Sequence, residues 1–177
     1  MNNTGIVRRL DDLGRIVIPK ELRNTLRLKE GDPIEISREG ENLFLRKFSP
    51  VDSIRFLAQT VADAIVDQTG KSCLITDTDK VIYSSGAENH SGQQLNQWSN
   101  KFMAERKTLK ASRKTSVLPT LFLGEDLTSF NFRMLVPIVK NGDCFGLMCL
   151  SSRGEDVITE KDESMLNLGV KVIVNGL

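Results

Sequence analysis

The chain reads Gly14-Arg15-Ile16-Val17-Ile18-Pro19-Lys20-Glu21-Leu22-Arg23 where its first small module changes from strand to helix. The run 15–18 is rich in β-branched residues and predicts a short strand. Pro19 then falls in the first turn of a helix, where a missing backbone N–H costs least, and Leu22 and Leu26 recur four residues apart on one helical face. We therefore expect a strand followed directly by a two-turn helix.

Further strands are predicted on both sides of this stretch. Residues 5–10 form a β-prone run that ends in a turn, and residues 33–37 and 43–47 predict a hairpin. The predicted module is β-β-α-β-β over residues 1–50, and it ends at Pro50 because proline cannot continue a strand ladder. Fifty residues of this kind bury too little apolar surface to be stable alone, so we expect a homodimer.

A helical link follows over residues 51–70. Ile54, Leu57, Val61 and Ala64 recur at steps of three and four residues, which places them on one seam of a helix. The seam either pairs with its copy in another chain or packs on the chain's own second domain. Two heptads are too few to decide between these alternatives.

The remaining residues, 71–177, have the pattern of a single α+β domain that ends in a helix. Thr159 and Asp162 give an N-cap signature for this closing helix, and Asn141-Gly142 predicts a tight hairpin turn. A further helix is expected over residues 93–110. The expected strands are 73–76, 81–84, 117–123, 130–139 and 144–150.

Composition favours a globular protein of a reducing compartment. The 177 residues are 40% hydrophobic and 27% charged, with three cysteines, which is an odd number, and all of them lie within residues 73–149. The sequence has neither a run of eighteen apolar residues nor the apolar centre of a signal peptide. We expect a cytoplasmic protein that does not bind membranes.

The net charge of +1 hides two basic regions. Residues 1–29 carry seven basic side chains against three acidic ones. Charge alone does not distinguish a nucleic-acid surface from a solvated face. A second basic run surrounds Glu105 in the sequence. For this run we favour a solvated helix face over a surface that binds DNA or an anionic ligand. Its basic residues are Lys101, Arg106, Lys107, Lys110, Arg113 and Lys114.

Residues 4–48, with the Gly-Arg-Ile-Val-Ile-Pro core and the Glu-Leu-Arg helix quoted above, resemble the DNA-binding domain of the AbrB-type transition-state regulators. The resemblance implies a swapped-hairpin β-barrel in which two chains interleave their strands. It also implies double-stranded DNA as the partner. With a second domain behind it, the chain is similar to sporulation-stage regulators of spore-forming bacteria.

The resemblance also implies which side chains contact DNA. Arg8, Arg15 and Arg23 stand at the matching positions, and Arg9 and Lys20 lie close enough in sequence to add phosphate contacts. Arginine suits this task because its planar fork of donors grips phosphates or guanine edges. One departure is Asn24, where relatives commonly carry a second basic residue.

The order of strands and helices in residues 71–177 resembles a GAF domain, a small-molecule-sensing module with an α/β/α architecture. Such domains hold ligands between the sheet and connecting segments, here 85–115 and 120–130. The sequence identifies no ligand and no cofactor. A domain that only holds an assembly together is the alternative.

Some GAF-fold proteins are thiol oxidoreductases, which would require a reactive cysteine. Cys73, Cys144 and Cys149 lie in or next to apolar strands, where cysteines are usually buried and inert. We therefore expect no catalytic residues.

A metal site is not expected either. Asp77 and Asp79 fit a hairpin turn better than a cation site, because no third or fourth oxygen ligand is evident nearby. His90 lies in a polar loop without the partners of a zinc site or a catalytic triad, so we expect it to be exposed.

Together these observations predict a sequence-specific DNA-binding transcription regulator, activator or repressor, of sporulation-stage genes. Residues 1–50 form a DNA-binding homodimer, and residues 51–70 and 71–177 extend it to a homotetramer that takes an unidentified small-molecule effector. By resemblance, the protein acts at the nucleoid of the forespore. The alternatives are an antitoxin-type DNA-binding protein and a GAF-fold thiol oxidoreductase.

Overall fold

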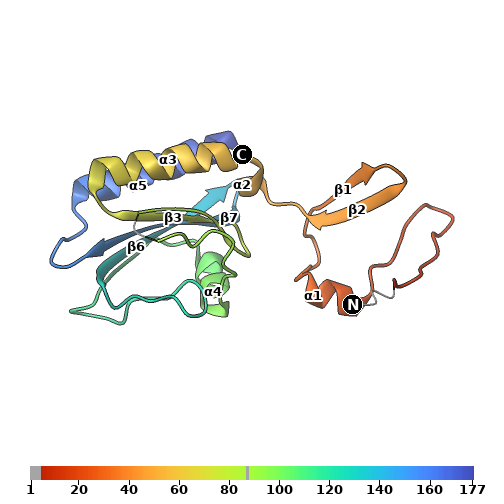
Figure 1. The fold of residues 1–177 in the computed structure, drawn as a ribbon, viewed down its shortest axis with the longest axis horizontal. Helices are drawn as coiled ribbons and strands as arrows, with labels where there is room; N and C mark the ends of the chain where they lie inside the picture. The colour runs from red at the N-terminus through yellow and green to blue at the C-terminus, as the bar shows by residue number, and fades with distance from the viewer. Residues whose placement is uncertain (1–4, 87) are drawn as a thin grey trace. The chain divides into compact units, whose positions relative to one another are not determined.

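Helices and antiparallel strands alternate along the chain in the computed structural model, which describes residues 5–86 and 88–177 (Figure 1). The predicted α+β class is confirmed. The chain divides into one unit that ends at Phe48 and a second that begins at Ser49.

The N-terminal unit contains one helix and one hairpin. Helix α1 spans Lys20–Thr25 and follows Pro19, as the sequence predicts. Strands β1, Ile34–Glu39, and β2, Asn42–Lys47, pair antiparallel with Ile36 opposite Leu45. Among the described residues up to Phe48, Pro19 alone is buried.

The strands expected over residues 5–10 and 15–18 are not formed in the single chain, which corrects the predicted β-β-α-β-β order to α-β-β. Figure 1 draws this segment as a trace that runs out and returns without strand arrows. At the tip, the Asp11 amide donates to the Arg15 carbonyl at 3.1 Å, and the Gly14 amide donates to the Asp11 carbonyl at 3.0 Å. A strand needs a neighbour for its backbone hydrogen bonds, and a single copy offers these runs none.

Apolar side chains of this unit remain in solvent. Val7 is 87% exposed, although β-branched residues of a strand normally pack on one face. A single copy thus has no hydrophobic core here. The exposed apolar residues are Ile6, Val7, Leu10, Leu13, Ile16, Val17, Leu22, Leu26, Ile36, Leu43, Phe44, Leu45 and Phe48.

The C-terminal unit is built on a five-stranded antiparallel sheet with strand order β4-β3-β7-β6-β5. The two long central strands form one hairpin, whose turn residues Asn141 and Gly142 have φ values of 53° and 89°, as the sequence predicts for a tight turn. The strands are β3 Ser72–Thr76, β4 Val81–Ser85, β5 Leu109–Ser112, β6 Phe130–Lys140 and β7 Asp143–Arg153.

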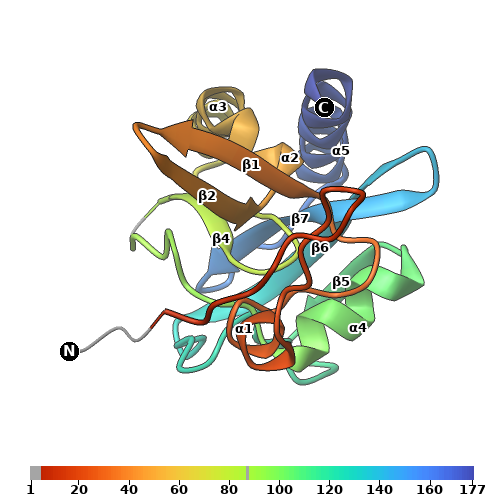
Figure 2. The same cartoon turned by 90° about the vertical axis from the view of Figure 1, so that its right-hand side faces the viewer.

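Helices cover both faces of this sheet. Figures 1 and 2 show α3 and α5 side by side over one face and α4 on the other. The Thr159–Asp162 capping box that the sequence predicts begins α5. The helices are α2 Pro50–Ser53, α3 Arg55–Thr69, α4 Gln97–Glu105 and α5 Glu160–Gly176.

Alternation along the strands divides the core into two layers. Ile75 and Leu150 pack in the cluster that contains the buried residues of α3 and α5, whereas their neighbours Leu74 and Cys149 pack with those of α4. This follows from the two-residue period of a strand, which sends successive side chains to opposite faces. The α/β/α layering predicted for the second domain is therefore observed.

The helical link expected over residues 51–70 is interrupted at Ile54, where φ is −108° and ψ is 29°. Helix α3 packs against the core of its own C-terminal unit, which was one of the two alternatives for the seam. Ala58, Ala62 and Ile65 are buried in this core. Ala64, which the sequence places on the seam, is exposed.

Two expectations between residues 93 and 123 are wrong. The helix predicted for 93–110 ends at Glu105, because Arg106 takes a left-handed conformation with φ of 55°, and the chain continues into strand β5. The strand predicted for 117–123 is irregular, apart from a single bridge between Leu95 and Phe122.

We predict that Gly146→Ala destabilises the C-terminal unit. A Cβ at this position would lie 1.9 Å from the carbonyl oxygen of Thr76, and backbone atoms of a central strand pair cannot move aside. The free energy of unfolding should fall by about 1–3 kcal/mol or more, measured by urea denaturation of the full chain followed by circular dichroism.

Gly176→Ala is the matched control, because its added Cβ would meet the end of the flexible Leu57 side chain. This variant should unfold at nearly the urea concentration of the unchanged protein. Equal stability of the Gly146→Ala variant would contradict the close approach.

Candidate functional site

The five basic side chains expected to contact DNA are all exposed. Arg8 and Arg9 lie on the extended segment, Arg15 at its return, and Lys20 and Arg23 on α1. Within the described residues, no hydrogen bond or ion pair links Arg8 or Arg9 to the other three.

Arg15 is held by the turn that precedes it. Its Nε lies 2.7 Å from Oδ2 of Asp11, and its backbone N–H donates to Oδ1 of the same carboxylate at 2.7 Å. These hydrogen bonds, the backbone bond first, lower the pKa of Asp11. The carboxylate holds the guanidinium through its Nε, and the Arg15 side chain remains 71% exposed.

Arg23 is held in a similar way by the segment before the helix. Its Nη1 donates to the Ile18 carbonyl at 2.8 Å. Because the Arg23 backbone N–H also binds the Pro19 carbonyl at 2.9 Å, the helix start and this side chain are positioned together. Both arginines therefore present guanidinium donors from defined local structures.

The second basic run does not form the helix face expected from the sequence. Lys101 is on α4, but Lys110 lies on β5 and pairs with Glu163. Arg113 donates to two backbone carbonyls, that of Leu127 in a loop and that of Phe130 on β6, the latter at 3.0 Å. Part of the run therefore stabilises the C-terminal unit.

The cysteines lack the environment of reactive thiols. Cys73 and Cys149 are buried and Cys144 is partly buried. Burial raises the pKa of all three thiols, which keeps them protonated at neutral pH. A protonated buried thiol is a poor nucleophile, and this disfavours the thiol oxidoreductase alternative.

Asp77 belongs to a turn, as interpreted from the sequence. Its Oδ1 accepts hydrogen bonds from the backbone N–H groups of Asp79 and Lys80, both at 2.7 Å.

Over residues 5–86 and 88–177, no cluster of three acidic, histidine or cysteine side chains is arranged to hold a metal. Over the same residues, no helix has the length and apolar character needed to cross a membrane.

His90 is not fully exposed, contrary to the sequence expectation. Its ring lies 5.0 Å from that of Phe122, its Nε2 lies 3.4 Å from a carboxylate oxygen of Glu88, and its side chain is 24% exposed. Packing against Phe122 draws the imidazole out of solvent. His90 thereby becomes part of the lining of a pocket.

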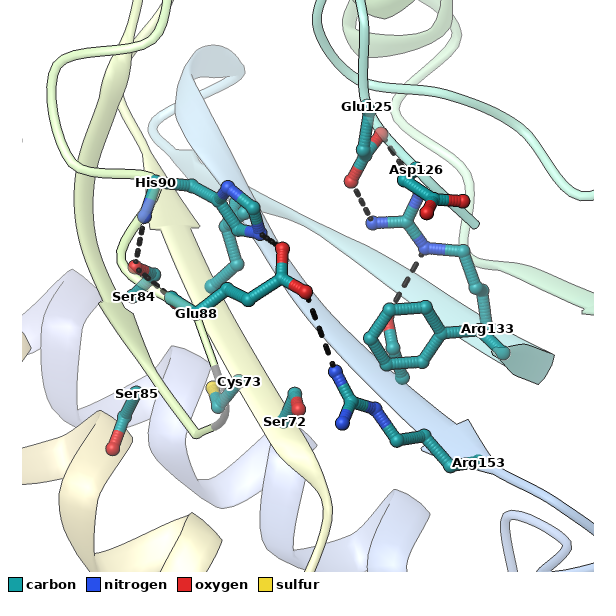
Figure 3. Close-up of a pocket in the computed structure, with 13 residues that line it drawn as sticks. Ser72, Cys73, Ser84, Ser85, Glu88, His90, Glu125, Asp126, Arg133 and Arg153 are labelled. Atoms are coloured by element: carbon teal, nitrogen blue, oxygen red, sulfur yellow. Dashed lines mark hydrogen bonds and ion pairs between the residues drawn. The ribbon is translucent and has the colours of Figure 1, made fainter. Parts of the chain in front are cut away.

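This pocket opens in the C-terminal unit between strands β3, β4, β6 and β7 and the loops that follow β4 and precede β6 (Figure 3). Part of its lining falls in segments 85–115 and 120–130, where the sequence places a ligand, and includes His90 and Glu125. The lining residues on β3 and β7 were not foreseen, because six separate segments of the chain meet there. Its polar lining includes Ser72, Glu88, His90, Arg133 and Arg153.

An ion pair buried in the pocket wall ties a loop to the sheet. Arg133 and Glu125 have side chains only 2% and 4% exposed, with Nη2 2.9 Å from Oε1. Arg133 also donates to the Pro119 carbonyl at 2.6 Å and to Ser151 Oγ at 3.1 Å. Glu125 in turn accepts from the Leu121 backbone N–H at 2.6 Å. This network holds the irregular segment between β5 and β6.

Comparison with known proteins matches both parts of the chain to sequence families. Residues 54–173 match the family described as "Stage V sporulation protein T C-terminal, transcription factor". Residues 7–53 match "Antidote-toxin recognition MazE, bacterial antitoxin".

Two proteins of Bacillus subtilis (strain 168) are similar in sequence. Stage V sporulation protein T is 40% identical over 159 residues, which cover 88% of this chain and 87% of that protein. The transition state regulatory protein AbrB is 38% identical over 84 residues, which are 48% of this chain and 88% of that protein.

The GAF domain of an Acinetobacter phosphoenolpyruvate-protein phosphotransferase is similar in structure. It superposes with a TM-score of 0.53 at 12% identity, over 90% of this chain and 93% of that one. At this identity the likeness concerns the fold, and the GAF-like fold expected for the second domain is confirmed.

We predict that Arg133→Met destabilises the C-terminal unit by about 3–5 kcal/mol, because it leaves the Glu125 carboxylate buried and unpaired. The double variant Arg133→Met/Glu125→Gln should be more stable than the single one, since it removes the unpaired charge. Urea unfolding of both variants, the Glu125→Gln variant and the unchanged chain gives the coupling energy between the two side chains. Additive effects of the two substitutions would contradict the role assigned to this pair.

Proposed function

The chain belongs to the family of stage V sporulation protein T, and we propose on this basis that it is a sequence-specific DNA-binding regulator that activates or represses transcription of sporulation-stage genes. The observation that carries the proposal is the likeness to stage V sporulation protein T along most of both chains. The family over residues 54–173 is itself described as a transcription factor.

The proposed function divides along the chain. Residues 1–50 are the DNA-binding domain, residues 51–70 the linking helix, and residues 71–177 a regulatory and oligomerisation domain. The likeness to AbrB, which covers less than half of this chain but most of AbrB, supports assigning DNA binding to the first part.

The N-terminal domain acts as a swapped-hairpin homodimer in this proposal. A second copy supplies neighbours for residues 5–10 and 15–18, which lack strand partners in one chain. It also covers side chains such as Val7, Val17 and Leu43, which are 67–87% exposed in one copy. Burying this surface provides the hydrophobic core that a single copy lacks.

The dimer presents Arg8, Arg15 and Arg23 twice on one surface, with Arg9 and Lys20 beside them. The exposure of all five and the anchoring of Arg15 and Arg23 support this assignment. Guanidinium forks can contact phosphates or guanine edges, and two-fold symmetry matches two DNA half-sites.

The antitoxin alternative is less well supported. The N-terminal residues match an antitoxin family. The C-terminal unit, however, has an extensive buried core of its own and matches a family described as a transcription factor. Antitoxins commonly bind their toxins with tails that are disordered until bound, which does not describe this unit.

A homotetramer formed through the helical layer extends the proposal. Apolar residues lie exposed on the two neighbouring helices: Phe56 on α3 is 83% exposed, and Leu168 and Val172 lie on α5. Joining two DNA-binding dimers raises their effective concentration along one duplex.

Acting on chromosomal DNA, the protein would reside in the cytoplasm at the nucleoid, and in the forespore during sporulation. A small-molecule effector in the C-terminal domain completes the proposal.

We predict that Arg8→Ala and Arg23→Ala each weaken DNA binding at least about tenfold. Each substitution removes two contacts per dimer. With about six contacts and a slope near −0.9 per phosphate, a fourfold rise in salt should weaken binding of the unchanged protein about a thousandfold, and each variant should show a shallower slope. Fluorescence anisotropy with an AT-rich duplex at several salt concentrations measures both quantities.

Lys107→Ala is the control, because it removes an exposed basic side chain of the second basic run. Its affinity for the duplex should equal that of the unchanged protein. Unaltered binding by both arginine variants, or no binding by the unchanged chain, would overturn the N-terminal assignment.

We also predict that Phe56→Glu converts the tetramer to a dimer, because it places a charge in the proposed apolar contact. Light scattering after size-exclusion chromatography reads the mass directly. Val117→Glu changes an exposed apolar residue of a loop in the same unit and should leave the mass unaltered. A dimeric mass of the unchanged chain at all concentrations would remove the tetramer.

A further inference from the structure

Arg153, at the end of β7, lines the pocket of Figure 3 with a guanidinium that is positioned but not hydrogen-bonded. Its Cζ lies 4.9 Å from the ring centroid of Phe130, the residue directly opposite it in the β6–β7 ladder. Its nearest charged partner among the described residues is Glu88, at 3.8 Å, which is too long for a hydrogen bond. The ring thus fixes the guanidinium while its N–H donors stay available.

The other arginine of the lining differs in this respect. Arg133 donates to Glu125, the Pro119 carbonyl and Ser151, and it is almost fully buried. Its donors are used to hold the pocket wall. Arg153 is therefore the cation of this lining that can receive an anion.

One hydroxyl group of the lining is also available. Ser72 on β3 is half-buried, and its hydroxyl has no hydrogen-bond partner among the described residues. Ser72 lies opposite Ser151 in the β3–β7 ladder, two residues before Arg153. A hydroxyl group close to a guanidinium that makes no hydrogen bond is a common setting for a carboxylate.

Acidic groups share the same lining and restrict what can bind. Glu88 lies between His90, 3.4 Å away, and Arg153, and Asp126 contributes a second carboxylate (Figure 3). Hydrogen bonds from Thr128, the backbone bond first, lower the pKa of Asp126, so it is ionised at neutral pH. One available cation and two carboxylates would repel a multiply charged phosphate, but they match a molecule that carries one carboxylate and one ammonium group.

We propose that this pocket binds a free α-amino acid, with the carboxylate on Arg153 and Ser72 and the ammonium group beside Asp126. The buried side chains of Leu74 and Phe130 in the lining provide an apolar surface for the side chain of the ligand. The inference deepens the proposed regulatory function of the C-terminal domain and rests on it. Glu88 competes with the ligand carboxylate for Arg153.

The test is isothermal titration of the full chain with individual L-α-amino acids, with acetate and inorganic phosphate as comparison probes. At least one amino acid should bind, and acetate and phosphate should bind much more weakly or not at all. Arg153→Gln should weaken binding of that amino acid at least about tenfold, because it removes a charge-assisted hydrogen bond. Glu88→Gln should strengthen binding, since it frees Arg153.

Lys107→Gln is the matched control, because it neutralises an exposed cation that is not in the pocket lining. Its affinity for the amino acid should be unchanged. Absence of binding by every amino acid, equal binding of phosphate, or full affinity in Arg153→Gln would each overturn the inference. DNA binding by the ligand-free Arg153→Gln chain is measured alongside, so that loss of the amino-acid site is distinguished from failure of the regulatory function itself.

Discussion

The C-terminal unit depends on the pairing of β6 with β7, two eleven-residue strands joined by the turn at Asn141-Gly142. Strand β3 adds to one side of this hairpin and β5 to the other, and β4 completes the sheet. Because successive residues of the hairpin point to opposite faces, it also provides the middle of both core layers. Gly146 is required within it, since the carbonyl oxygen of Thr76 occupies the space of a Cβ.

The same hairpin positions two arginines that have different roles. Arg133 points into a buried network, where Glu125 neutralises it and loop carbonyls take its remaining donors. Arg153, near the strand end, rests on the ring of Phe130 with its side chain 43% exposed. Burial and the availability of partners, rather than residue type, separate a structural cation from one that can recognise a ligand.

The N-terminal unit, unlike the C-terminal unit, does not form a hydrophobic core within one chain. Its hairpin and helix form locally, but one copy leaves nearly all of its apolar residues exposed. Such a surface is too extensive for a stable monomeric module. The proposed DNA-binding dimer would resolve this deficit, because the association that covers the apolar side chains would also double the arginines on one face. Folding and recognition would then depend on the same contact between chains.

Short-range patterns in the sequence were sufficient to predict the family likeness and three local structures. These structures are the start of α1 after Pro19, the hairpin turn at Asn141-Gly142 and the capping box of Thr159. Each depends on residues within a few positions of one another. The edge strand β5 was missed because its four residues become a strand only by pairing with residues of β6 that lie twenty or more positions later. His90 was expected in solvent because its neighbours in sequence are polar, whereas Phe122 covers it. The pocket and the Arg133–Glu125 pair were decided by tertiary structure, since strand pairing and burial join segments whose proximity no local pattern encodes.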